Sequence, residues 1–363
     1  MPKIRMLSTV QIELTLKGYV MNHLIRSQGC LIGGAIGDAL GYPIEFMSEE
    51  SILYKYGPDG LTDYVLINDI AQISDDTQMT LFTADAIICA KNKFPEQWLN
   101  DRVIIPYMFH CYQDWMLTQT EDYPLPDITP TYSNLVYVPE LFARRAPGTT
   151  CMEALRSRQM GSITKPLNDS KGCGGVMRVA PLALALYGKN ISPAQTALLG
   201  AKAAAITHGH ELGYIPAAAL TFLIAELLNG ISLEDAVKHI SPLLISLFPM
   251  SENLNRLLML LAQAQTLAHL KAPSDEAFKL SGQGWVAEET VAIAIYCALK
   301  YSNDFEKGVL AAVNHSGDSD STGSVTGQIL GIYLGFEAIP QKYIQPLELK
   351  EVILRTAAEL ARK

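Results

Sequence analysis

Apolar residues recur at the three- and four-residue spacing of a helix along nearly the whole chain, and this periodicity is the strongest constraint on the fold. A half-buried strand would need apolar and polar residues in alternation, and no run of β-branched residues with that period is long enough to indicate one. Hydrophobic residues make up 49% of the 363 residues and charged ones 18%, so the chain can bury a large core. The sequence therefore predicts an all-α globular protein.

Several of the expected helices open with Ser, Asp or Pro, as helix N-termini commonly do. The first, residues 31–40, is rich in Gly and Ala, which lets a neighbour approach closely, and it should end near Gly41, Tyr42 and Pro43. Asp76 is expected to cap the second helix. That helix and those after it are predicted at 77–90, 95–115, 150–158, 176–187, 193–206, 212–229, 233–247, 252–270, 286–301, 304–314, 324–334 and 346–362.

Residues 119–147 carry many Pro and Tyr residues without periodicity, which predicts a long irregular loop of the kind that tends to be functional. Neither a tandem repeat nor a low-complexity linker divides the chain. We therefore predict a single domain, residues 29–363, preceded by an N-terminal extension, residues 1–28. That extension fails as a signal peptide because Glu13 and Lys17 interrupt its apolar stretch.

The composition also excludes some classes of partner. The net charge is −9, from 28 Lys plus Arg against 37 Asp plus Glu, and no long basic run occurs, so nucleic acid is not an expected partner. The apolar run 217–225 is too short to span a bilayer, so no membrane partner is expected. The 6 cysteines are scattered without a C-x-x-C pair, which favours free thiols in a reducing compartment. The predicted location is the cytoplasm.

Two short aspartate clusters lie almost a whole chain apart, at residues 74–77 (Ser-Asp-Asp-Thr) and 317–322 (Gly-Asp-Ser-Asp-Ser-Thr). One acidic cap before a helix is common, because carboxylates favour the positive end of the helix dipole. Two such clusters, each with flanking hydroxyl groups, are uncommon in one chain. Neighbouring carboxylates also repel one another, so they cannot all ionise readily without a cation. Hard oxygen ligands with no partnered Cys or His select magnesium or manganese over zinc. Together the clusters indicate a two-metal site.

Two other metal motifs are disfavoured by single residues. The second cluster begins like an EF-hand loop, but the twelfth residue counted from Asp318 is Ile329, where a bidentate Glu is needed. A helical magnesium enzyme acting on isoprenyl diphosphates would need carboxylates spaced as D-D-x-x-D, and Met79 occupies the place of the last one.

Further polar motifs lie between the clusters. Residues 168–178 form a Gly-rich loop leading into a helix, an arrangement that can hold phosphate oxygens, although a tight turn explains the glycines equally well. It is not a Walker loop, because G-K-[ST] is missing. His208 and His210 lie at a predicted helix junction, where capping of a helix C-terminus is favoured over metal binding. The sequence around Glu45, taken alone, predicts only a solvated side chain for it.

In this order, these segments resemble the ADP-ribosylglycohydrolase family, which includes the dinitrogenase reductase-activating glycohydrolases. The resemblance covers about Gly29 to Gly335. Its most specific parts are residues 37–41 (Gly-Asp-Ala-Leu-Gly) with Glu45, 74–79, 172–181 and 317–322. The resemblance implies an all-α, orthogonal multi-helix bundle with two Mg²⁺ or Mn²⁺ ions at the bottom of a cleft. It also implies a metal-dependent hydrolase that removes ADP-ribose from modified protein side chains.

The resemblance assigns a role to each matching residue. It implies that the metal ligands are Ser74, Asp75, Asp76, Asp318, Asp320 and Ser321, with Asp320 placed to bridge the ions. The family usually has Thr at positions 74 and 321, and Ser keeps the hydroxyl oxygen. The implied catalytic residues are Glu45, a gate and acid or base on a mobile loop, together with Asp76 and Asp318. The implied substrate-binding residues are Ser170, Lys171, Gly172 and Gly174 at the pyrophosphate and His208 along the ribose and phosphate channel.

The implied reaction cleaves the bond at the anomeric carbon of the distal ribose. That carbon develops oxocarbenium character, so the site must orient the ribose diol, deliver water and protonate the leaving group. The pattern Lys-Gly-Cys-Gly-Gly at 171–175 favours arginine-linked ADP-ribose over serine adducts, O-acetyl-ADP-ribose or polymers. The Tyr-rich segment 123–137 is a candidate for stacking on adenine.

A second hypothesis is a binding or immunity protein that neutralises an ADP-ribosyltransferase partner through residues 1–28. Apolar side chains in that extension could fill a groove on the partner: Ile12, Leu14, Leu16, Tyr19, Val20 and Leu24. Packing of this segment on the protein's own surface is the favoured alternative. The two functions can coexist, because a hydrolase that removes a toxin's mark also protects the cell.

Overall fold

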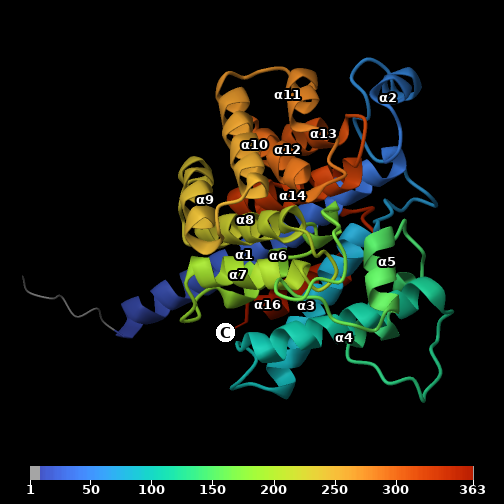
Figure 1. Ribbon diagram of the computed structural model, residues 1–363, viewed down its shortest axis with the longest axis vertical. Helices are drawn as coiled ribbons and strands as arrows, with labels where there is room; N and C mark the ends of the chain where they lie inside the picture. Colours follow the sequence, from blue (N-terminus) through green and yellow to red (C-terminus); the bar gives the residue numbers. More distant parts are fainter. Residues whose placement is uncertain (1–8, 363) are drawn as a thin grey trace, which may run out of the picture.

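The computed structural model describes the backbone of residues 9–362 and the side chains of residues 21–362. Figure 1 shows a bundle of helices that cross at many angles, with the long α1 running through the whole molecule. Within residues 9–362 there is no β-strand, only isolated bridges. The all-α prediction is confirmed. The longer helices are α1 (Thr9–Gly41), α3 (Asp75–Lys93), α4 (Asp101–Thr120), α7 (Pro193–Ala204), α8 (Glu211–Leu228), α9 (Leu233–Leu247), α10 (Glu252–His269), α12 (Ala287–Lys300), α14 (Ser319–Leu334) and α16 (Lys350–Leu360).

The shorter elements fill the gaps between these helices. Three of them, α2, α11 and α15, were not predicted, because each has only a few residues and too few turns to show a helical period. The short helices are α2 (Glu49–Tyr56), α5 (Thr149–Arg156), α6 (Ala180–Leu186), α11 (Ser274–Ser281), α13 (Phe305–Val313) and α15 (Gln341–Ile344). The 3-10 turns are η1 (Tyr42–Ile44), η2 (Asn134–Tyr137), η3 (Pro139–Leu141), η4 (Cys173–Gly175) and η5 (Phe336–Ala338).

Helix ends are where the sequence predictions fail. The start predicted at Pro95 is wrong, because Asn100 is the N-cap of α4 and accepts a 2.9 Å hydrogen bond from the backbone N–H of Arg102. The predicted cap at Asp76 is also wrong, since Ser74 is the N-cap of α3 and its hydroxyl accepts from the Asp76 N–H. Likewise α14 begins at Ser319 rather than 324, because Asp318 is its N-cap. Both aspartate clusters therefore occupy helix N-termini.

α1 and α14 pack backbone against backbone. A Cβ added at Gly29 would fall 2.1 Å from the carbonyl oxygen of Gly331, and one added at Gly37 would fall 2.0 Å from that of Gly323. Gly29, Gly33 and Gly37 are spaced four residues apart and so lie on one ridge of α1, where any side chain would force the helices apart. The pairing is antiparallel. It therefore brings the end of α1, and the loop that follows it, against the start of α14.

α8 is the apolar centre of the bundle. By length and composition it is the one helix among the described residues that could cross a membrane, but 89% of it is buried inside the fold. It packs against α6, α7, α9, α10 and α12, which cover its surface. Its hydrophobicity therefore fits a core helix of the bundle.

The segment between α4 and α5 is a long loop, as predicted, with η2 and η3 as its only short turns within the described chain (Figure 1). Two buried carboxylates hold it. Asp114 accepts hydrogen bonds from the backbone N–H groups of Tyr132 (2.6 Å) and Ser133 (2.7 Å). Asp85 accepts from the N–H of Asn134 at 2.8 Å. The loop is thus fixed at its middle before it returns to α5.

The boundary predicted between residues 28 and 29 falls inside α1, which continues across it. Residues 1–8 and the side chains of residues 9–20 lie outside the described part of the chain. Most of the segment proposed to bind an ADP-ribosyltransferase is therefore not described, and both the extension and its binding role stay predictions.

Candidate metal centre

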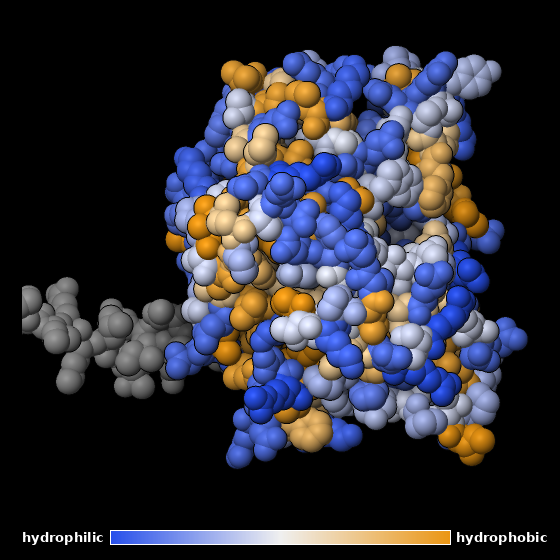
Figure 2. All heavy atoms as spheres, viewed as in Figure 1, coloured by the Kyte–Doolittle hydropathy of each residue, from blue (hydrophilic) through white to orange (hydrophobic). Residues whose placement is uncertain are grey.

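The two aspartate clusters meet at one cavity. It has a volume of about 320 Å³, and its lining includes Asp75 and Asp76 from α3 with Asp318, Asp320 and Ser321 from the start of α14. Figure 2 shows the surface hollowed beside α5, whose first residues also line this cavity. Segments separated by more than two hundred residues thus face one another across a single hollow.

A carboxylate on α1 holds the first cluster in place. Asp38 is fully buried and accepts from the backbone N–H of Ser74 (2.9 Å) and of Thr77 (3.0 Å), and also from the Thr77 hydroxyl. Asp75 is fixed separately, because its Oδ2 accepts a 3.0 Å hydrogen bond from the N–H of Gly148. The first turn of α3 is therefore locked between α1 and the end of the long loop.

The second cluster is held by its own helix. Asp318 accepts from the backbone N–H of Ser321 at 3.2 Å, and Asp320 accepts from the same N–H at 3.0 Å. The Ser321 hydroxyl then donates to Asp76 Oδ1 at 3.2 Å, which links the two clusters directly. The thiol of Cys173 donates to Asp318 Oδ2 at 2.7 Å.

Glu45 joins this group from the loop after α1. One oxygen each from Glu45, Asp318 and Asp320 lies within 4.8 Å of the others, a spacing that could hold a metal ion. Its Oε2 is buried without a hydrogen-bond partner, and so is Asp76 Oδ2. The adjacent Phe46 has a positive φ of 68° and stacks on Trp285, with ring centroids 5.3 Å apart. The expectation of a solvated Glu45 is wrong, because the α1–α14 contact carries it into the cavity.

Without a cation this group of carboxylates is electrostatically unfavourable. Burial, with repulsion from Asp320, raises the pKa of Asp38 to about 7 and that of Glu45 to about 10. Burial likewise raises the pKa of Asp75, Asp76 and Asp320 well above the ordinary range, with repulsion from their neighbours adding to it. Within residues 21–362, no lysine or arginine forms an ion pair with any of them.

These residues fit a divalent cation site. The donors are carboxylate and hydroxyl oxygens, the ligands that Mg²⁺ and Mn²⁺ prefer, and two buried carboxylate oxygens have no hydrogen-bond partner among the described residues. Unpaired buried acceptors and uncompensated negative charge both cost free energy, and a cation removes both costs.

The raised pKa values predict how the metal-free protein responds to pH. The folded state holds protons on Asp38 and Glu45 that the unfolded state releases near the ordinary values of 3.8 and 4.5. Stability without metal should therefore fall as pH rises from these ordinary values towards the folded-state pKa values of about 7 for Asp38 and about 10 for Glu45. With saturating Mg²⁺ or Mn²⁺ the stabilisation should instead grow with pH, because ligands bind deprotonated. Thermal unfolding in chelator and in metal measures both trends, and a metal-free melting temperature that rises with pH contradicts the prediction.

Three of the five predicted substrate-binding residues lie at the metal cavity, and the other two do not. Gly172, Gly174 and His208 line the same cavity as the aspartates. A Cβ at Gly174 would lie 2.9 Å from Cys151 Sγ and 3.1 Å from His208 Cε1, so no side chain fits there. His210, by contrast, caps the N-terminus of α8 by accepting from the Leu212 N–H at 3.0 Å, not a C-terminus as expected.

Three predicted site residues do not line the cavity. Ser74 is fully buried beneath it and serves as the N-cap of α3. Ser170 shares a 2.9 Å hydrogen bond with the hydroxyl of Thr150. The Lys171 ammonium pairs with the buried carboxylate of Glu288 at 2.5 Å. Their assigned roles stay predictions.

Several residues of the site escaped the sequence analysis. Asp38 lies within the motif at residues 37–41, and a lone carboxylate in the otherwise apolar stretch 29–41 was a signal of burial with partners. Cys173 was quoted only as part of the Gly-rich loop. Trp285 and Phe46 left no usable signal, because their contact joins segments far apart in the sequence.

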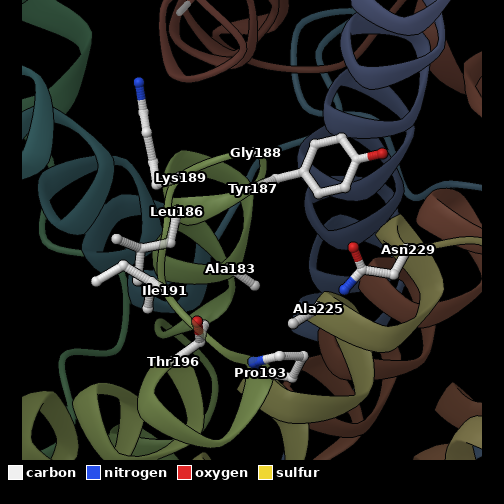
Figure 3. Close-up of a pocket in the computed structure, with 10 residues that line it drawn as sticks. All are labelled: Ala183, Leu186, Tyr187, Gly188, Lys189, Ile191, Pro193, Thr196, Ala225 and Asn229. Carbon is white, nitrogen blue, oxygen red and sulfur yellow. The ribbon is translucent and has the colours of Figure 1, made fainter.

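Another cavity, of about 270 Å³, lies between α6, α7 and α8 and is drawn in Figure 3. Its lining mixes polar and apolar groups, and the one charged residue among those drawn, Lys189, extends away from Pro193 and Thr196. It holds no carboxylate and offers no comparable chemistry.

Comparison with known proteins identifies the family of this chain. The family model for ADP-ribosylglycohydrolase matches residues 21–363. An ADP-ribosyl-[dinitrogen reductase] glycohydrolase of Rhodospirillum rubrum is 24% identical, covering 90% of this chain and 91% of its own. The mouse ADP-ribosylhydrolase ARH3 is 25% identical, covering 89% and 87%. An ADP-ribosylarginine hydrolase, Tri1, of Pseudomonas putida is 22% identical, covering 93% and 78%.

A solved structure titled ADP-ribosylglycohydrolase-related protein complex has the same fold, with a TM-score of 0.60 at 22% identity, over 94% of this chain and 99% of that one. The chain therefore belongs to the ADP-ribosylglycohydrolase family, and it is a hydrolase of that family.

Proposed function

We propose that this protein is a metal-dependent hydrolase that removes ADP-ribose from modified protein side chains, with arginine as the first-ranked linkage. The observation that carries the proposal is that the aspartates of both clusters line one cavity together with the glycine loop. Glu45 reaches the same cavity, with one oxygen within 4.8 Å of Asp318 and Asp320. A cation-binding floor beside a glycine-rich loop suits a ligand that has both a sugar diol and a pyrophosphate.

The proposed cofactor is a pair of Mg²⁺ or Mn²⁺ ions held by Ser74, Asp75, Asp76, Asp318, Asp320 and Ser321. When bound, such ions supply Lewis-acid stabilisation and lower the pKa of a bound water. Asp76 and Asp318 would orient the ribose by holding these ions in place. Ser170, Gly172 and Gly174 bind the pyrophosphate, and Lys171 adds a positive charge beside this loop. His208 lines the ribose and phosphate channel.

We assign the acid or base role to Glu45. Its carboxyl group is largely buried at the cavity, and burial raises its pKa to about 10 in the metal-free protein, so it can hold a proton there at neutral pH. It lies on a loop that the exposed Phe46 ring connects to Trp285, which suits a gate at the cavity mouth.

Replacing Glu45 by glutamine should lower turnover by about 10²–10⁴-fold, because the amide neither donates nor accepts a proton in the reaction. Metal affinity should change by less than about tenfold, since Glu45 is proposed as a gate and not as a required ligand. Steady-state kinetics and calorimetric titration with Mn²⁺ measure the two effects. Glu50→Gln, at an exposed carboxylate on α2, is the matched control. A loss of metal binding equal to the loss of turnover would instead make Glu45 a ligand.

The proposal is tested by incubating the protein and Mg²⁺ with arginine-ADP-ribosylated and serine-ADP-ribosylated peptides. We expect release of free ADP-ribose from the arginine adduct, and none after chelation of the metal. Asp320→Asn protein controls for contaminating hydrolases. Turnover of the serine adduct alone would overturn the ranking of linkages, and turnover of neither would overturn the activity.

The free thiols of all the cysteines suit the cytoplasm, which we propose as the compartment.

A further inference from the structure

A buried arginine lies behind the cavity without a carboxylate partner. The side chain of Arg178 is fully buried, and none of the ion pairs within residues 21–362 includes it. Its guanidinium lies 4.3 Å from the ring centroid of Tyr112 and donates to the carbonyl oxygen of Ala203 at 3.3 Å and to the hydroxyl of Thr207 at 2.7 Å. Burying a cation among neutral groups is costly, so its contacts call for a functional explanation.

The contact with Thr207 has a defined direction. A guanidinium has only donors, so the Thr207 hydroxyl oxygen must accept from Arg178. The hydroxyl then has one proton to donate. Two acceptors are within its reach, His208 Nδ1 at 2.9 Å and the sulfur of Cys151, and the ring nitrogen is the stronger acceptor because a thiol sulfur accepts only weakly. A ring nitrogen that accepts carries no proton, so in a neutral His208 the proton lies on Nε2.

The charge state of His208 agrees with this arrangement. Burial, together with the nearby positive charge of Arg178, lowers the pKa of His208 to about 3, so the ring is neutral at physiological pH. A doubly protonated ring would carry a proton on Nδ1 and would lose the hydrogen bond from Thr207.

The second ring nitrogen of His208, Nε2, lies on the ring edge that faces the glycine loop. A Cβ built at Gly172 would lie 3.5 Å from His208 Nε2, and one built at Gly174 would lie 3.4 Å from it. Both glycines and His208 line the cavity of the aspartates. Nε2 makes no hydrogen bond to any described residue, so its N–H is available to a ligand in that cavity.

We propose that Arg178 and Thr207 are positioning residues that fix His208 as the Nε2–H tautomer, so that His208 meets the bound ligand only as a hydrogen-bond donor. The ligand atom that it fits is an oxygen acceptor without a proton, such as a phosphate oxygen. The identity of that ligand as ADP-ribose rests on the proposed function, but the tautomer does not.

The tautomer is measured directly by two-bond ¹H–¹⁵N correlation spectra of protein labelled with ¹⁵N-histidine, with His208 assigned by its loss in His208→Gln. In the wild-type protein we expect Nδ1 at the shift of an unprotonated ring nitrogen and Nε2 at that of a protonated one. A proton on Nδ1 of His208 in the wild-type protein would overturn the proposal, and this result requires no variant to fold.

Thr207→Val tests the relay, because it removes the hydroxyl at nearly constant volume. We expect protonated character to appear at Nδ1, while Thr207→Ser, which keeps the hydroxyl, retains the wild-type spectrum. Thr221→Val is the matched control, since the Thr221 hydroxyl is also fully buried but donates only to the Ala217 carbonyl oxygen within α8. An unchanged His208 tautomer in Thr207→Val would overturn the role of Thr207.

Ligand binding separates this inference from the proposed function. Affinity for ADP-ribose, measured by calorimetry, should fall about tenfold in Thr207→Val relative to Thr221→Val, as expected for one misdirected hydrogen bond. If the spectra show the Nε2–H tautomer and its dependence on Thr207, but even the wild-type protein does not bind ADP-ribose, the relay is supported and the proposed function fails. Equal affinity in both variants would overturn the donor role of His208 toward that ligand.

Discussion

Replacing Asp320 by asparagine is expected to make the metal-free protein more stable and to abolish its response to divalent cations. Asp320 is buried among acidic side chains, and repulsion from it is among the causes that raise the pKa of Asp38, Glu45 and Asp76. Removing its charge should stabilise the metal-free fold by roughly 2 kcal/mol, because asparagine keeps the acceptor for the Ser321 N–H.

The same change should remove the metal effect. In the wild-type protein, a cation at a hundred times its dissociation constant should add about 2.7 kcal/mol of stability, and chelator should remove it. Asp320→Asn should show no shift with Mg²⁺ or Mn²⁺. Differential scanning calorimetry with chelator and with metal gives both quantities. Asp69→Asn, at an exposed carboxylate outside both clusters, should behave as wild type. A variant that is no more stable without metal, and still responds to metal, would place the cation elsewhere.

Replacing Asp38 by asparagine should weaken metal binding without removing any proposed ligand. Asp38 accepts from the N–H groups of Ser74 and Thr77 and from the Thr77 hydroxyl, and so holds the first turn of α3 in place. An amide offers one acceptor and two donors, and its NH₂ group would face donors. We expect a loss of about 2 kcal/mol of stability and a 10–100-fold loss of metal affinity.

A second buried aspartate separates the two effects. Asp85 accepts from the Ser133 hydroxyl at 2.6 Å and the Asn134 N–H at 2.8 Å, and thereby holds the long loop rather than the metal centre. Asp85→Asn should cost similar stability but leave metal affinity unchanged. Chemical unfolding and Mn²⁺ titration of both variants provide the comparison. Equal metal affinities in the two variants would show that Asp38 supports the fold alone.

Much of the helical content was predictable because helical periodicity is local. The bounds of α9 match the prediction, since Ser232 caps it and its apolar residues repeat regularly over fifteen residues. Helices α2 and α11, each of eight residues, were missed because two turns give too little periodicity to detect. The caps of α3 and α14 were misplaced because several consecutive polar residues could each have served as the cap.

The candidate site, too, was predictable from the sequence only in part. The acidic clusters and the glycine loop were visible as unusual residue types in sequence, and their convergence on one cavity was a prediction that the structure now supports with distances. The burial of Glu45 and the support from Asp38 were not predictable from local pattern. Both depend on the contact between α1 and α14, whose paired glycines lie about three hundred residues apart.

The sequence by itself determined the helices and the chemistry available to the site, because helical periodicity, capping and ligand hardness are properties of neighbouring residues. Only the tertiary structure decided which carboxylate is a neighbour of which, and which way Thr207 directs its proton. Those outcomes depend on close packing of segments that are distant in the chain, and packing is set by the shape of the whole bundle.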